Sequence, residues 1–111
     1  MGHGLGATRE LRLDAYARRF AQAGIAALAF THRGFGESAE CRPPRQVLSL
    51  RRQIQNWEAA LSYVKGQTAI DAARIGLWGS SFGGGHAITV ARRHPELELT
   101  TRQRGVGAYL R

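Results

Sequence analysis

The chain has 111 residues, of which 43% are hydrophobic and 22% charged, and its formal net charge is +8. This length allows one small domain, and the apolar fraction excludes a disordered tail. No run of about 18 apolar residues occurs, which excludes a membrane-spanning helix. The only cysteine, Cys41, can form neither an internal disulfide nor a metal cluster. Residues 1–4 lack the regions of a signal peptide, so we expect a cytoplasmic protein.

The first predicted elements follow a glycine-rich segment at residues 2–8. Apolar residues from Leu13 to Ala23 recur on one face of a helix, and Gly24 stands where a C-terminal cap is expected. Residues 25–30 are a continuous apolar run, which is typical of a strand buried on both faces of a parallel sheet. The order of these elements is therefore loop, helix and strand.

The second half of the chain repeats this alternation. Apolar residues at helical spacing over 47–64 predict an amphipathic helix that Gly66 ends. Residues 74–78 predict a second short buried strand, and a tight turn then leads into a helix that runs to about His94. Alternating helices and strands indicate an α/β fold in which helices flank a parallel sheet.

The sequence Gly79-x-Ser81-x-Gly83 lies between the second strand and its helix, the context that defines a nucleophile elbow. A reactive serine must project from a sharp, strained turn, and glycine two positions away avoids a collision there. The helix that follows directs its free N–H groups at developing negative charge. Ser81 is therefore the candidate nucleophile, and the Phe82 N–H is a candidate oxyanion donor. The alternative is a glycine-rich turn without a reactive serine.

A second motif, His3-Gly4-Leu5-Gly6, precedes the first helix. Acyl transfer needs a second N–H donor from another loop, which commonly carries a His-Gly sequence. Leu5 is the candidate for this donor. The alternative is a flexible glycine loop with no role in catalysis.

Three stretches together resemble an α/β-hydrolase, most closely the dienelactone hydrolases and acyl-peptidase-like esterases. They are the His3-Gly4 loop, the segment Phe30 to Ser38 with its His-Arg-Gly-Phe-Gly core, and Leu77 to Gly84. The resemblance implies a serine hydrolase that cleaves esters, thioesters or amides through an acyl-enzyme and needs no metal or other cofactor. It assigns the nucleophile to Ser81 and the oxyanion-hole N–H groups to Phe82 and Leu5.

The chain departs from the family in several places. Thr31 and His32 stand where the family has Asp and an aromatic residue, so we expect a less firmly anchored loop there. The family places its acid and histidine in loops well beyond the nucleophile, but only 30 residues follow Ser81. His86 and His94 fall on the elbow helix, where we expect a packed side chain and a C-terminal cation rather than a base.

These departures predict a partial α/β-hydrolase fold with an incomplete sheet. Residues 1–96 are expected to form the N-terminal part of the domain, without the strand that precedes His3 in the family. Residues 97–111 are expected to form an irregular tail, the product of a truncation or frameshift. We expect the triad acid and histidine to be absent from this chain.

The expected partner is a small-molecule acyl substrate, with no nucleic acid and no membrane. Exposed apolar sheet edges are expected to promote self-association. Two alternatives have one feature each in their favour. The net charge of +8 favours a basic nucleic-acid-binding protein. Gly2-x-Gly4-x-x-Ala7 resembles a dinucleotide-binding fingerprint, although the acidic residue expected after the next strand is missing.

Overall fold

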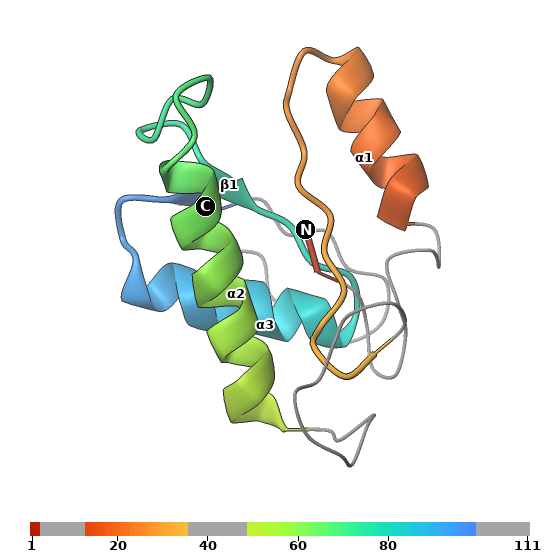
Figure 1. The fold of residues 1–111 in the computed structure, drawn as a ribbon, viewed down its shortest axis with the longest axis vertical. Coiled ribbons are helices and arrows are strands. Elements are labelled where there is room, and N and C mark those ends of the chain that lie inside the picture. The colour runs from red at the N-terminus through yellow and green to blue at the C-terminus, as the bar shows by residue number, and fades with distance from the viewer. Residues whose placement is uncertain (3–12, 36–48, 100–111) are drawn as a thin grey trace.

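The computed structural model describes residues 1–2, 13–35 and 49–99, and along these ranges helices alternate with short strands. Figure 1 shows the path of the chain. Within the described ranges no helix combines the length and the apolar character that a membrane span requires. The elements in chain order are α1 (Leu13–Gln22), α2 (Leu50–Lys65), β1 (Gly76–Leu77), α3 (Phe82–Arg93) and β2 (Glu98–Leu99).

The helices end where local signals in the sequence predict. Beyond α1, Gly24 has a φ of 80°, a conformation that glycine adopts without steric cost. α2 begins after Ser49, whose side-chain oxygen accepts a hydrogen bond from the Arg52 N–H at 3.3 Å. Gly66 ends α2, and its N–H donates to carbonyl oxygens of the last turn. All three predicted helices are confirmed, although the expected start of α2 near Val47 lies outside the described residues.

The described strands pair in parallel. β1 and β2 are neighbours in one sheet, and Gly2 forms parallel bridges with both Phe30 and Gly79. Gly2 therefore stands between the end of the apolar run at 25–30 and the end of β1. Met1 and Gly2 lie where the strand before His3 is expected, but only bridges at Gly2 form there and no strand is assigned to these two residues. The register pairs are Gly76 with Glu98 and Leu77 with Leu99.

The apolar run at residues 25–30 does not form the doubly buried strand that the sequence predicts. Only Phe30 makes a bridge, and the side chains of Ile25 and Leu28 are 55% and 37% exposed. A parallel strand is buried on both faces only when neighbouring strands and helices cover it. The described segment beside this run consists of Met1 and Gly2 alone, and its bridge is to Phe30, the last residue of the run.

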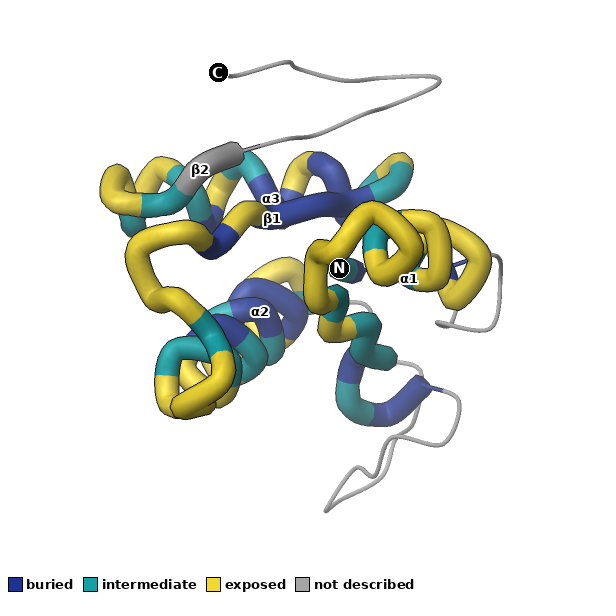
Figure 2. The backbone as a smooth tube through the Cα atoms, turned by 90° about the horizontal axis from the view of Figure 1, so that it is seen from above, coloured by how far each residue is buried: buried dark blue, intermediate teal, exposed yellow. Residues whose placement is uncertain are grey.

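The main hydrophobic core lies between α2, α3 and β1. In Figure 2 the buried parts of α2 and α3 lie toward β1, whereas their outer turns are exposed. Apolar residues at helical spacing on α2 supply the largest part of this core, as their period predicts. The buried members of the core are Ile54, Trp57, Leu61, Ile75, Leu77, Ala87 and Val90.

α1 covers the opposite face of the sheet. Leu77 belongs to the core formed with α2 and α3, whereas the next residue, Trp78, packs against α1. Successive residues of a strand point to opposite faces, so these contacts define three layers. The Trp78 ring lies 4.6 Å from the Tyr16 ring and 6.5 Å from the Phe20 ring between centroids. Apart from Leu13, the side chains of α1 are partly or fully exposed (Figure 2).

The end of the described chain is more regular than expected. Residues 97–111 were predicted to be irregular, but Glu98 and Leu99 form β2 and pair with β1. The Leu97 N–H donates to the His94 carbonyl oxygen at 3.0 Å and so turns the chain from α3 back to the sheet. The prediction is therefore wrong for residues 98–99, and residues 100–111 lie outside the described part.

Candidate active site

The candidate site is the turn at Ser81, between the bridge at Gly79 and the start of α3. Ser81 has φ 53° and ψ −120°, and within the described residues it is the one non-glycine residue with positive φ. Such a conformation costs about 1–3 kcal/mol and persists only where the surroundings impose it. The residue is also exposed. The strained backbone and the exposed position that the sequence predicts for Ser81 are therefore both present.

Glycine at position 79 is a steric requirement of this turn. A Cβ atom there would overlap the backbone of Gly83 and come within 2.6 Å of the Gly84 nitrogen. The predicted collision two residues before the serine is therefore confirmed. Gly84 is buried at the start of α3, whereas Gly85 makes no such close approach. Gly85 is exposed, and a Cβ there would meet nothing within 4 Å.

The start of α3 provides N–H groups beside the serine. Ser81 is the N-cap residue, but its side chain makes no capping hydrogen bond. The N–H groups of Gly83 and Gly84 donate to the carbonyl oxygens of Ser80 and Ser81, each at 2.9 Å. Phe82 precedes them as the first helical residue, where an N–H has no acceptor within its own helix. The first turn of α3 holds no acidic residue, so its partial positive charge is not offset locally.

The second candidate donor, Leu5, lies outside the described residues, as do His3 and Gly4. The residue before them, Gly2, is described and lies close to the elbow strand. Gly2 forms a parallel bridge with Gly79, and its N–H donates to the Trp78 carbonyl oxygen at 3.2 Å. Gly2, the last described residue before this segment, therefore lies beside the strand end that leads into the elbow. Glycine is required at position 2 because a Cβ there would overlap the Trp57 ring.

His86 is a packed residue of α3, as the sequence predicts. It is buried, and its Nε2 donates a hydrogen bond to Gln53 Oε1 at 2.6 Å. The ring also lies edge-on to Phe82, with 4.7 Å between centroids. Gln53 is itself buried on α2, so this bond joins the elbow helix to its neighbour.

His32 is the feature that the sequence did not reveal. Its loop was expected to be less firmly anchored than in the family, but the side chain is 1% exposed. Its Nδ1 accepts a hydrogen bond from Asn56 Nδ2 at 3.3 Å, and its carbonyl oxygen accepts one from the Phe35 N–H at 3.1 Å. The His32 and His86 rings meet edge-on at 5.7 Å between centroids. The expectation of a weakly anchored loop is therefore wrong over the described residues 31–35.

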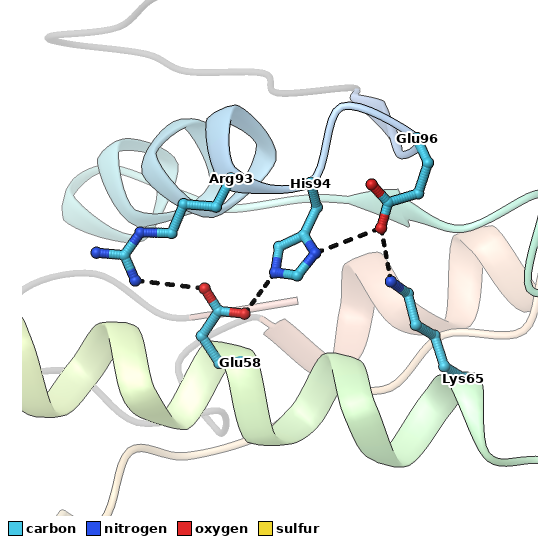
Figure 3. A network of polar contacts seen from close by, with 5 residues as sticks. All are labelled: Glu58, Lys65, Arg93, His94 and Glu96. Atoms are coloured by element: carbon cyan, nitrogen blue, oxygen red, sulfur yellow. Dashed lines mark hydrogen bonds and ion pairs between the residues drawn. The ribbon is translucent and has the colours of Figure 1, made fainter.

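His94 lies at the opposite end of α3, in a charged network that joins α3 to α2 (Figure 3). Its Nε2 is 2.6 Å from Glu58 Oε2 and its Nδ1 is 3.3 Å from Glu96 Oε1. Arg93 reaches Glu58 at 3.4 Å, and Lys65 reaches Glu96 at 2.7 Å. The hydrogen bond from Lys65 lowers the pKa of Glu96 to about 2. This cluster joins two helices and does not contribute a base to the elbow.

Metal binding has no support in the described part of the chain. Within it, no group of three or more His, Cys, Asp or Glu side chains could hold an ion. The turn itself places an exposed serine at the N-terminus of α3.

Comparison with known proteins assigns the family. Residues 1–101 match the family described as "Serine aminopeptidase, S33". The chain can be superposed on the crystal structure of the α/β hydrolase GrgF from a Penicillium species with a TM-score of 0.82 and 25% identity, over 91% of this chain and 35% of that one. The chain therefore belongs to the α/β-hydrolase superfamily, and its fold is a partial α/β-hydrolase fold.

Curated relatives carry several activities in their names. The quorum-quenching protein AidA of Acinetobacter baumannii is 43% identical over 103 residues, which are 93% of this chain and 33% of that protein. The thiohydrolase aneE of Aspergillus aculeatus is 37% identical over 91 residues, which are 82% of this chain and 28% of that protein. The chain thus spans about a third of the length of these relatives.

Proposed function

We propose that Ser81 is the nucleophile of a serine hydrolase that cleaves an ester, thioester or amide through an acyl-enzyme. The observation that carries this proposal is the conformation of Ser81, which is an exposed residue with φ 53° at a strand-to-helix turn. A strained conformation at a solvent-facing serine has no evident structural benefit. This exposed serine stands at the N-terminus of α3, where the positive end of the helix favours developing negative charge.

The proposed reaction proceeds in two steps. Ser81 Oγ attacks the substrate carbonyl carbon as a base removes its proton, and the carbonyl oxygen becomes an oxyanion. The Phe82 N–H and the Leu5 N–H donate hydrogen bonds to this oxyanion, each worth about 10²–10³ in rate. The leaving group departs with a proton and leaves an acyl-serine. Water then attacks the acyl carbon, releases the acid and restores the hydroxyl.

The base and the acid of the triad are proposed to come from outside the described residues. Among the described histidines, His32 and His86 are buried and hydrogen-bonded to amides of α2. His94 pairs with two carboxylates at the far end of α3. A nucleophilic serine needs a base within hydrogen-bond reach, and these three side chains are held elsewhere.

The names of the relatives support an acyl substrate carried on sulfur or oxygen. Relatives named a thiohydrolase, a polyketide transferase and an acyltransferase match 82%, 75% and 86% of this chain. We propose a small acyl thioester or ester as the substrate class and, with no metal or other cofactor involved, water as the acceptor.

A fluorophosphonate probe tests the nucleophile directly. The expected result is slow labelling of the 111-residue chain that is absent from Ser81→Ala. Labelling should be slow because oxyanion donors and binding alone retain only about 10³–10⁴ over water when the triad is incomplete. Thr89→Ala, which alters an exposed hydroxyl on α3, is the matched control and should label normally. Labelling that persists in Ser81→Ala, or that equals that of the urea-unfolded chain, would contradict the proposal.

A further inference from the structure

Two amide side chains on α2 each hold one buried histidine. Gln53 Oε1 accepts from His86 Nε2 at 2.6 Å, and Asn56 Nδ2 donates to His32 Nδ1 at 3.3 Å. Residues three apart lie on the same face of a helix, so the two histidines meet α2 side by side. Both bonds fit neutral rings that carry their proton on Nε2.

The two histidines come from segments on either side of the candidate site. His86 belongs to the first turns of α3, five residues after Ser81, and its ring packs against Phe82. His32 belongs to the turn that follows the bridge at Phe30, and the Phe30 ring lies 5.4 Å from it. The histidine rings meet at 5.7 Å. The cluster therefore joins the turn after Phe30, α2 and the start of α3.

The conformation at Ser81 needs such support. A positive φ at a non-glycine residue persists only when surrounding contacts determine it, and the Ser81 side chain adds no capping bond to stabilise the start of α3. A buried polar pair resists displacement, because a shift that breaks the bond leaves both partners without water or protein to replace it. The His86–Gln53 bond thus fixes the position of the first turns of α3 along α2.

We propose that the His86–Gln53 hydrogen bond, reinforced by His32 and Asn56, is the positioning unit of the elbow. It holds Ser81 in its strained conformation and orients the Phe82 N–H toward the space above the hydroxyl. The functional consequence rests on the proposed hydrolase activity, whereas the effect on backbone geometry does not. His86 and His32 are positioning residues in this scheme, and neither touches the substrate.

Amide hydrogen exchange on the 111-residue chain tests the geometric claim. Gln53→Leu keeps the side-chain volume and removes the acceptor, and Ser62→Leu alters an exposed polar side chain on the same helix as the control. In Gln53→Leu the Gly83 and Gly84 N–H groups should exchange roughly ten- to a hundredfold faster relative to Val90, because a buried donor loses its partner. Ser62→Leu should leave these ratios unchanged, and Gln53→Glu, which retains an oxygen acceptor, should restore protection. An equal increase along all of α3, or no change, overturns the proposal.

Two further measurements keep the proposal testable if Gln53→Leu fails to fold. Imidazole ¹⁵N spectra of the wild-type chain should show His86 as the neutral Nε2–H tautomer, and an Nδ1–H tautomer would overturn the assigned bond. Fluorophosphonate labelling of Ser81 should slow about ten- to a hundredfold in His86→Ala, and remain unchanged in Ser62→Leu. If the wild-type chain is not labelled, only the proposed hydrolase function is refuted. The positioning role of His86 and Gln53 is still tested by the amide exchange ratios and by the His86 tautomer.

Discussion

The two faces of the sheet are covered to different degrees. α2 and α3 enclose a continuous core with β1, in which Trp57 is 2% exposed. On the opposite face α1 rests on Trp78 through two aromatic rings, and Ile25 remains 55% exposed nearby. Both faces carry amphipathic helices, so the difference in burial comes from the contacts of each helix. α2 and α3 pack against each other and against β1, whereas α1 has aromatic contacts with Trp78. The elbow follows β1 and leads into α3, which is one of the two helices of the well-covered face.

The largest effect should come from the centre of the well-covered face. Trp57→Ala removes a buried side chain that packs against Phe30 and the residues of α2 and α3. We expect it to lower the free energy of unfolding by about 3–5 kcal/mol. Tyr63→Ala removes a 61% exposed ring from the same helix and should change it by less than about 0.5 kcal/mol. Urea unfolding followed by circular dichroism measures both, and similar losses would show that the two positions are packed alike.

The glycines of the elbow should respond in opposite directions. Gly79→Ala forces a methyl group into the Gly83 backbone and should destabilise the chain by about 1–3 kcal/mol. Gly85→Ala adds a methyl group in open space on α3 and should stabilise the chain by about 0.5–1 kcal/mol, because alanine has a higher helix propensity than glycine. Thermal unfolding of both variants checks the signs. A stabilising effect of Gly79→Ala would contradict the close approach on which the turn depends.

The exposed apolar run at residues 25–30 should govern self-association. Ile25 and Leu28 expose apolar surface on a run whose pairing partner is short. We expect the double variant Ile25→Lys, Leu28→Lys to weaken self-association about tenfold, because it removes apolar area and adds repulsion. Sedimentation velocity over a concentration series provides the measurement. Tyr63→Lys, which changes an exposed ring on α2, is the control. If Tyr63→Lys weakened self-association equally, the association would not depend on residues 25–30 in particular, and the prediction would be wrong.

The smallest effect should arise at the exposed network of Figure 3. The Lys65 hydrogen bond lowers the pKa of Glu96 from 4.5 to about 2. A carboxyl with a lower pKa in the folded chain stabilises the fold above its unfolded pKa, and this contribution is lost as the pH falls from about 4.5 to 2. Glu96→Gln should therefore be slightly less stable than wild type near neutral pH and equally stable near pH 2. A difference that does not change with pH would argue against the ion pair.

Helices and the elbow could be predicted from the sequence because their signals are local. The apolar spacing of α2, the cap at Gly24 and the glycine before Ser81 each act within a few residues. Strand 74–78 was predicted in the right place but is shorter, since regular pairing covers only residues 76–77. The buried role of His86 followed from its place on a helix beside the elbow.

What the sequence determined by itself was therefore the order of elements and the geometry demanded at Ser81, because periodicity and glycine sterics depend on near neighbours. Only the tertiary structure decided which apolar segments are covered, why Gly2 must lack a side chain beside Trp57, and that His32 meets His86. These properties depend on contacts between residues far apart in the chain. No local pattern encodes such contacts, because packing and the availability of a partner strand decide them.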